Sequence, residues 1–224
     1  MLRIVFWKLG FEWANLKRIL QPRDDQTIYY FAFGANLSPD ILKQRRIAVL
    51  ESFDYILEGA ELRFSQPGFY KGHAYASADE APGKKMYGRM LLIRKSDAER
   101  MDYYEGVPFL KAHDKVVHQA PELTFYYYRA RTTAEGLKPT QEYLDFITTA
   151  YREMDCVPTE YLEQMETTEV LEHFEMQTLT GRFIRDIDSW PSVLHPVLIK
   201  YEGIGRWLVK LMWNWSVLTW MIKD

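Results

Sequence analysis

A strand-like run that ends in a glycine constrains the fold more than any other part of this sequence. Residues 27–33 are mostly β-branched and aromatic, which is typical of a β-strand, and the run stops at Gly34. Ser38 followed by Pro39 is a typical helix start, because serine caps free backbone N–H groups and proline fits the first helical position. The sequence therefore predicts a strand, a tight turn and a helix that reaches about Arg46.

The rest of the chain adds strands first and helices later. Strands are expected at 55–65, 85–93, 115–119 and 124–131, and helices at 97–104, 140–153 and Thr159–Glu166. Because strands and helices do not alternate regularly, the pattern predicts an α+β fold with an antiparallel or mixed sheet. At 224 residues, with 47% hydrophobic and 26% charged residues, the chain is long enough for one substantial core.

The two ends have a different character from the middle. Residues 2–20 and 206–222 are amphipathic, basic and rich in tryptophan, and they predict a helix at each terminus. Such helices fit either a membrane surface or packing on the body or on a second copy in a homodimer. We therefore expect an N-terminal segment 1–23, a central domain 24–170 and a C-terminal extension 171–224.

Charge and cysteine content exclude several classes of function. The net charge is −3, and no basic patch lies in the middle of the chain, so we expect no nucleic-acid partner. The single cysteine, Cys156, fits a reducing, cytoplasmic location, with peripheral membrane attachment as the alternative. The five histidines lack zinc-type spacing and no nucleotide-binding motif is present, so we expect no metal and no cofactor.

Two segments carry residues suited to chemistry. A strand that ends in Gly34, Ala35 and Asn36 exposes successive backbone N–H groups, which bind a carboxylate or an oxyanion, although the same residues fit an ordinary turn. Glu105 follows a short helix, where the helix dipole and flanking tyrosines are expected to raise the pKa of its carboxyl group, as suits a general base. A solvated glutamate at a helix end is the alternative.

Taken together, these segments resemble the γ-glutamyl cyclotransferase family. The resemblance covers roughly residues 27–168. Four motifs appear in the family's order: Tyr30-Phe-Ala-Phe-Gly-Ala-Asn-Leu37, Gly72-His-Ala-Tyr-Ala-Ser with Lys85-Met-Tyr-Gly88, Asp102-Tyr-Tyr-Glu-Gly-Val107, and Pro139-Thr-Gln-Glu-Tyr-Leu144. The resemblance implies a small mixed β-barrel flanked by helices.

The resemblance also implies a reaction and the residues for it. The α-amine of a γ-glutamyl compound attacks its own γ-carbonyl group and releases 5-oxoproline and an amine. Glu105 would be the acid/base. Substrate binding would fall to Tyr30, Phe31, Ala32, Phe33, Gly34, Ala35, Asn36 and Tyr143.

Three departures from the family's pattern leave the substrate open. Phe33 stands where tyrosine is common, Ala35 stands where serine is common, and a tyrosine expected after Glu105 is missing, with His113 as a substitute. The alternatives are a γ-glutamyl-binding protein without activity or a membrane-associated scaffolding protein on the same fold.

Overall fold

A computed structural model describes residues 2–20, 26–68, 72–110, 112–172, 193, 196, 216 and 218–222. Its core is a five-stranded sheet with the strand order β2-β3-β1-β5-β4. Among the strands that the structure describes, only the β1–β5 pair is parallel. The strands are β1 Thr27–Ala32, β2 Val49–Pro67, β3 Ala74–Arg94, β4 His113–Gln119 and β5 Thr124–Ala130.

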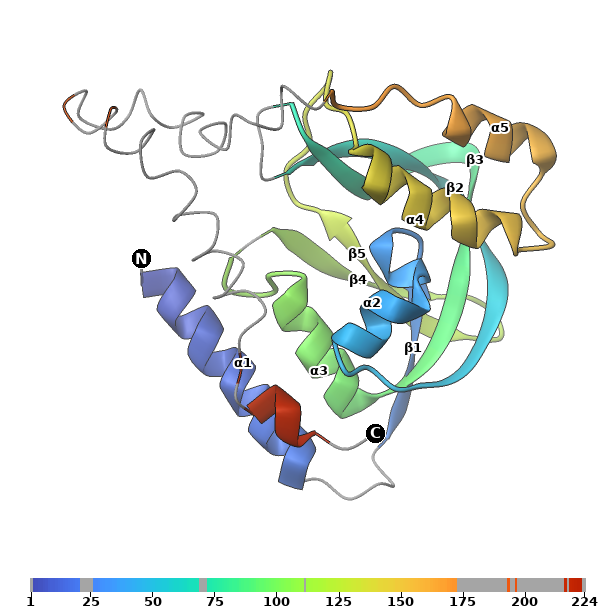
Figure 1. Ribbon diagram of the computed structural model, residues 1–224. Helices are drawn as coiled ribbons and strands as arrows, with labels where there is room; N and C mark the ends of the chain where they lie inside the picture. The colour runs from blue at the N-terminus through green and yellow to red at the C-terminus, as the bar shows by residue number, and fades with distance from the viewer. Residues whose placement is uncertain are drawn as a thin grey trace.

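Helices surround this sheet (Figure 1). The helices are α1 Leu2–Leu20, α2 Pro39–Gln44, α3 Lys95–Tyr104, α4 Gln141–Arg152 and α5 Thr159–Glu166, with short 3-10 turns η1 Ala35–Leu37 and η4 Leu218–Met221. Helix α3 directly follows β3, and α1 packs against α3.

The central strand β1 is buried over its second half. Phe31 and Ala32 are fully buried, and the aromatic run of β5 packs beside them. Because β1 lies in the middle of the sheet and ends at Ala32, the turn at Gly34 that follows it lies between helices α2 and α4 rather than at an outer edge. The α+β expectation is confirmed, and the core positions the glycine turn.

The closed barrel expected from the resemblance is not confirmed. In the part of the chain that the structure describes, β2 and β4 stand at opposite ends of the strand order, so the sheet is open. The long β2–β3 hairpin extends the sheet instead of closing it, because the two strands pair with each other over most of their length.

The hairpin is also longer than the sequence indicated. Pro82 and Gly83 predict a break before residue 85, yet β3 runs on both sides of them. Glu58 pairs with Lys85, while Ala60 pairs with Glu80, so β3 carries extra residues at this point. A β-bulge accommodates a proline that cannot donate to the ladder, which explains why the strand continues.

The terminal helices fare differently. Helix α1 has the expected bounds, and it buries Trp7 and Phe11 against Tyr103 and Tyr104 of α3. The expected helix at 206–222 lies mostly outside the described residues. Within that range, the described Ser216 accepts a hydrogen bond from Asn15 of α1 and donates one to Glu12 of α1. Within the described residues, no helix combines the length and the apolar character needed to cross a bilayer.

Candidate active site

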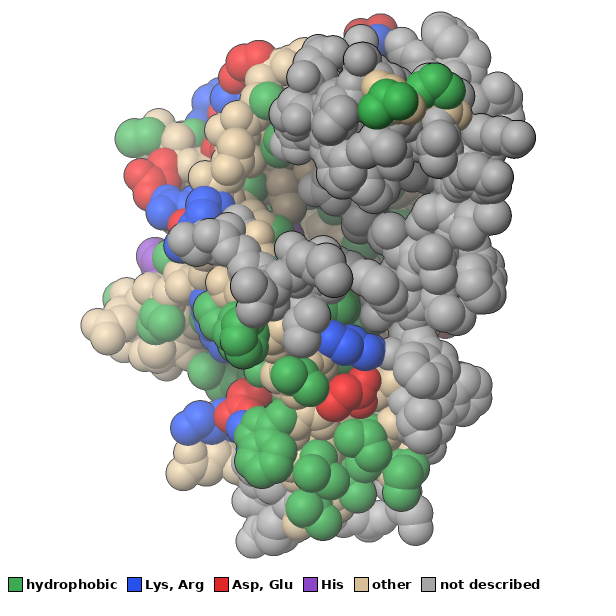
Figure 2. All heavy atoms as spheres, turned by 90° about the vertical axis from the view of Figure 1, so that its left-hand side faces the viewer, with side chains coloured by type: hydrophobic (Ala, Val, Ile, Leu, Met, Phe, Trp, Pro, Cys, Tyr) green, Lys and Arg blue, Asp and Glu red, His purple; other side chains and the backbone are tan. Residues whose placement is uncertain are grey.

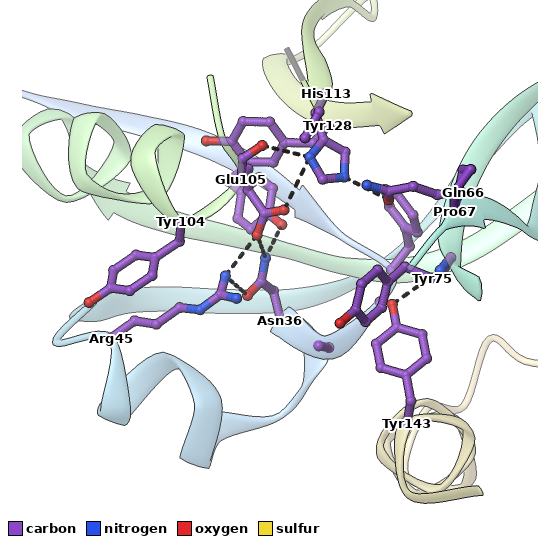
Figure 3. Close-up of a pocket in the computed structure, with 16 residues that line it drawn as sticks. Asn36, Arg45, Gln66, Pro67, Tyr75, Tyr104, Glu105, His113, Tyr128 and Tyr143 are labelled. Carbon is purple, nitrogen blue, oxygen red and sulfur yellow. Dashed lines mark hydrogen bonds and ion pairs between the residues drawn. The ribbon is translucent and has the colours of Figure 1, made fainter. Parts of the chain in front are cut away.

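A cavity of about 210 Å³ opens where the glycine turn meets the ends of α2 and α3. Its lining comes from elements far apart in the sequence, namely the turn after β1, the end of α2, the β2–β3 hairpin, the segment after α3, β5 and the first turn of α4. Figure 3 shows Asn36, Glu105 and His113 pointing toward one another on one side of it, with Tyr143 on the other.

Glu105 is the acidic residue of this cavity. It forms the C-terminal cap of α3, and its side chain is 15% exposed. Its Oε1 atom accepts a hydrogen bond from Nη1 of Arg45 at 2.7 Å and another from Nδ2 of Asn36 at 3.2 Å. The two donors therefore occupy one carboxylate oxygen, and Oε2 remains on the side of His113.

His113 contacts the same glutamate. Its Nδ1 atom lies 3.6 Å from Oε2 of Glu105 and donates to the Glu105 carbonyl oxygen at 2.7 Å. Its Nε2 atom lies 2.8 Å from Oε1 of Gln66. Because a carbonyl oxygen only accepts, Nδ1 carries a proton, and the ring is either cationic or neutral with the Gln66 amide turned over. In both states Nδ1–H fixes the ring beside the carboxylate.

The pKa of Glu105 shifts in the direction opposite to the sequence expectation. Burial raises the pKa of this carboxyl group, but Arg45, His113 and the hydrogen bonds from Arg45 and Asn36 together lower it below its usual value. The expectation of a raised pKa was wrong because it considered only the helix end and the neighbouring tyrosines. Glu105 is therefore an ionised carboxylate at neutral pH.

The glycine turn is closed on one side by Tyr143. A side chain at Gly34 would place its Cβ atom 3.0 Å from Oη of Tyr143. That hydroxyl group accepts a hydrogen bond from the Ala76 N–H group at 3.2 Å and another from Ala35, and burial raises the pKa of Tyr143 to about 12. The Ala35 N–H group is thus already bonded, so the turn does not present all of its N–H groups to the cavity.

The other residues expected at the site divide into two groups. Tyr30, Phe33, Gly34, Ala35, Asn36 and Tyr143 line the cavity together with Glu105. Phe31 and Ala32 do not line it, because both are fully buried in the central strand. The Tyr30 hydroxyl accepts a hydrogen bond from Asn36 at 2.7 Å, which orients the amide that reaches Glu105.

Sequence reasoning missed the cation of the site. Arg45 caps α2, lies over the ring of Tyr104 at 4.9 Å, and also donates to Oδ1 of Asn36 at 2.8 Å. It is 60 residues from Glu105 in the chain, and no local pattern marks it. Lining residues Gln66, Tyr75 and Tyr128 were missed for the same reason.

Among the described residues, no cluster of three or more histidine, cysteine, aspartate or glutamate side chains is arranged to hold a metal ion. The polar side chains that line the cavity carry one carboxylate, one guanidinium, one imidazole, two amides and several tyrosine hydroxyls. This set suits proton transfer and the binding of a zwitterionic small molecule.

Comparison with known proteins relates the fold to solved structures. No protein-family model and no curated protein matches this sequence. A structure named gamma-glutamyl cyclotransferase is similar, with a TM-score of 0.53 and 20% identity over 69% of this chain and 99% of its own. An uncharacterized protein from Homo sapiens has a TM-score of 0.53 and 20% identity, over 70% and 99%. YkqA from Bacillus subtilis has a TM-score of 0.52 and 16% identity, over 70% and 60%. The chain has a γ-glutamyl cyclotransferase-like fold.

Proposed function

We propose, from this fold and from an ionised carboxylate that faces the cavity beside the glycine turn, that the protein is a γ-glutamyl cyclotransferase. The observation that carries the proposal is the position of Glu105. One of its oxygens is held by Arg45 and Asn36, and the other is turned toward His113 and the cavity. A small-molecule γ-glutamyl compound is the proposed partner.

The proposed reaction moves two protons from the attacking nitrogen to the leaving nitrogen. Oε2 of Glu105 accepts a proton from the α-ammonium group of the substrate, and the freed amine attacks the γ-carbonyl carbon to form a five-membered ring. Glu105 gives this proton to the leaving nitrogen as its bond to that carbon breaks, and the ring nitrogen then loses its second proton, by way of the same carboxylate, to the departing amine. The products are 5-oxoproline and an amine, and no redox step or cofactor is involved.

The cavity supports this reaction mainly through positioning. The attack is intramolecular, so a site that holds both ends of the γ-glutamyl group lowers the entropic part of the activation barrier. Such positioning lowers the barrier by up to about 7–11 kcal/mol in well-oriented cases. The turn at Gly34 lines the cavity, where its backbone N–H groups would be suited to the developing oxyanion, and Tyr143 on the opposite side limits the orientation of the substrate.

One observation favours the alternative of a γ-glutamyl-binding protein without turnover. Arg45 is paired with Glu105 at 2.7 Å, and the resulting lowered pKa makes the carboxylate a weaker base. Binding without turnover would then follow from the same geometry. The membrane-associated scaffold and the cytoplasmic location remain predictions.

Release of 5-oxoproline from a panel of γ-glutamyl amino acids, peptides and amines tests the proposal. On an accepted substrate, Glu105→Gln should lower turnover by about 10²–10⁴-fold, because the amide cannot take the proton. Glu142→Gln, an exposed residue of α4, is the matched control and should leave turnover unchanged. A Glu105→Gln protein with wild-type turnover would remove Glu105 from the mechanism. Binding of panel members without any release would support the alternative.

A further inference from the structure

Arg100, on helix α3, is a fully buried cation outside the cavity lining. Its side chain is 0% exposed, and it lies in the part of α3 that α1 covers. Burying a guanidinium group is costly unless its N–H groups are bonded. The partners of Arg100 therefore show what the residue is there to hold.

The hydrogen-bond acceptors belong to α1 and to the end of α2, while Oδ1 of Asp97, on the same helix as Arg100, lies 3.7 Å from Nη1 of Arg100. Nη2 of Arg100 donates to the carbonyl oxygen of Arg45 at 2.7 Å, and Nη1 donates to the carbonyl oxygen of Arg46 at 2.5 Å. Nε donates to Oδ1 of Asn15 on α1 at 2.8 Å. One side chain thus connects three helices.

The two carbonyl groups lie at a strained point of the backbone. Arg45 caps the C-terminus of α2, and Arg46 has a φ of 54°, in the left-handed region that favours glycine. A cation at the carbonyl end of a helix is favourable. Bonds from Arg100 to both carbonyl groups therefore hold the backbone in this conformation, and the conformation sets the direction of the Arg45 side chain.

Arg45 connects this backbone to the cavity. Its guanidinium group donates to Oε1 of Glu105 and lies over the Tyr104 ring. Burial raises the pKa of Glu105, and Arg45 contributes most among the groups that lower it, ahead of His113 and Asn36. The lowered pKa of Glu105 therefore depends in large part on its contact with Arg45.

We propose that Arg100 is a positioning residue that, braced by Asn15 of α1, fixes the end of α2 and thereby holds Arg45 against Glu105. Its catalytic consequence rests on the proposed function, but its structural consequence does not. Without Arg100, the Arg45–Glu105 contact loosens while Glu105 stays buried, so the pKa of Glu105 rises. The N-terminal helix then contributes to the site without lining it.

The test measures the pKa of Glu105 by an NMR pH titration of protein labelled with ¹³C at the glutamate carboxyl carbons. The Glu105 signal is assigned as the one missing in Glu105→Gln. We expect Arg100→Gln to raise the pKa of Glu105 by on the order of one unit or more. Arg100→Lys keeps the positive charge but has fewer hydrogen-bond donors, so it should raise the pKa of Glu105 by a smaller amount. The acidic side of the pH–activity profile for 5-oxoproline release should also move to higher pH, further in Arg100→Gln than in Arg100→Lys.

Arg18→Gln is the matched control. Arg18 is also a buried arginine at the α1–α3 contact, but it donates to Asp97 at 3.0 Å and not to the α2 carbonyl groups. The Arg18→Gln substitution should lower the melting temperature of the protein and leave the pKa of Glu105 unchanged. Equal shifts in Arg18→Gln and Arg100→Gln would overturn the proposal, because general loosening would then explain both.

Two further outcomes are decisive. If Arg100→Gln does not fold, Arg100→Lys and Asn15→Ala replace it, and an unchanged pKa of Glu105 in both folded variants overturns the proposal. If no protein releases 5-oxoproline, the proposed function fails, but the pKa of Glu105 still decides whether Arg100 positions Arg45.

Discussion

At the scale of single residues, Gly34 and Tyr143 form a contact that leaves little room for change. A methyl group at residue 34 would lie 3.0 Å from Oη of Tyr143, so the hydroxyl would have to move by a few tenths of an ångström. The same hydroxyl accepts the Ala76 N–H group. The contact therefore links the glycine turn to the β2–β3 hairpin across the cavity.

We expect Gly34→Ala and Tyr143→Phe each to raise the KM of an accepted substrate. Loss of the tyrosine hydroxyl should cost about 0.5–1.5 kcal/mol, the usual value of one neutral hydrogen bond. The double variant should lose less than the sum, because phenylalanine lacks the oxygen atom that the added methyl group would meet. Steady-state kinetics of the two single variants and the double variant measure this coupling.

Tyr151→Phe is the control for losing a buried tyrosine hydroxyl. That hydroxyl donates to the Tyr87 carbonyl oxygen at 2.9 Å and does not line the cavity, so its loss should affect stability and not KM. Strictly additive effects of the Gly34 and Tyr143 changes would contradict the proposed contact.

At the scale of elements, α1 has two apolar faces. The inner face packs on α3. The outer face carries Phe6, Leu9, Trp13 and Leu20, which are 53%, 62%, 60% and 74% exposed. Figure 2 looks onto this side and shows hydrophobic side chains gathered in its lower half. With the half-buried Leu16, these positions follow the alternating spacing of three and four residues that is typical of paired helices.

We expect this outer face to pair with α1 of a second copy rather than with an anionic membrane. The lysines beside it are already neutralised, since Lys8 pairs with Glu12 and Lys17 pairs with Glu99, which weakens attraction to anionic lipid. Packing on α3 covers only the inner face of α1, and the apolar side chains of the outer face stay exposed among the described residues. The expected partner is therefore a helix with the same spacing.

Sedimentation velocity across a concentration series tests the pairing. Wild-type protein should dimerise, and Leu9→Glu with Trp13→Glu should be monomeric at the same concentrations. Val117→Glu, at an equally exposed apolar position on β4, should behave as wild type. A wild-type monomer that pellets with anionic liposomes would establish the membrane surface instead.

At the scale of the whole molecule, Gly88 decides how closely β1 and β3 approach. A Cβ atom there would lie 2.3 Å from the Ala32 carbonyl oxygen and 2.7 Å from the Phe31 ring. Neither neighbour is a flexible chain end, so the strands must separate. Because β1 is central and ends at the glycine turn, that separation reaches both the core and the cavity.

Gly88→Ala should therefore lower the free energy of unfolding by about 1–3 kcal/mol, as overpacking does, and should also weaken activity. Gly59→Ala is the comparison, because nothing lies within 4 Å of its Cβ position and only its φ of 77° is unfavourable. It should lose about 1–2 kcal/mol of stability through backbone strain and keep full activity. Denaturant unfolding and turnover of both variants check this difference, and a Gly88→Ala protein as stable as wild type would refute it.

The elements that the sequence determined by itself are those with local causes. Helix α1 and helix α5 have the expected bounds, and β1 ends at Ala32, just before the glycine turn at Gly34, with α2 starting at Pro39. Periodicity, a helix-capping position and a strand-breaking glycine act within a few neighbouring residues. These signals can therefore be read without knowing what the elements pack against. Glu105 at the end of α3 belongs to the same class.

Only the tertiary structure decided the charge of the site and the shape of the sheet. The bond from Arg45 to Glu105 reverses the expected direction of the Glu105 pKa, and Arg100 joins α1 to the end of α2. The open edges β2 and β4 replace the expected barrel. These outcomes depend on contacts between residues tens of positions apart. Local propensity carries no information about such contacts, because the whole core must first bring the residues together.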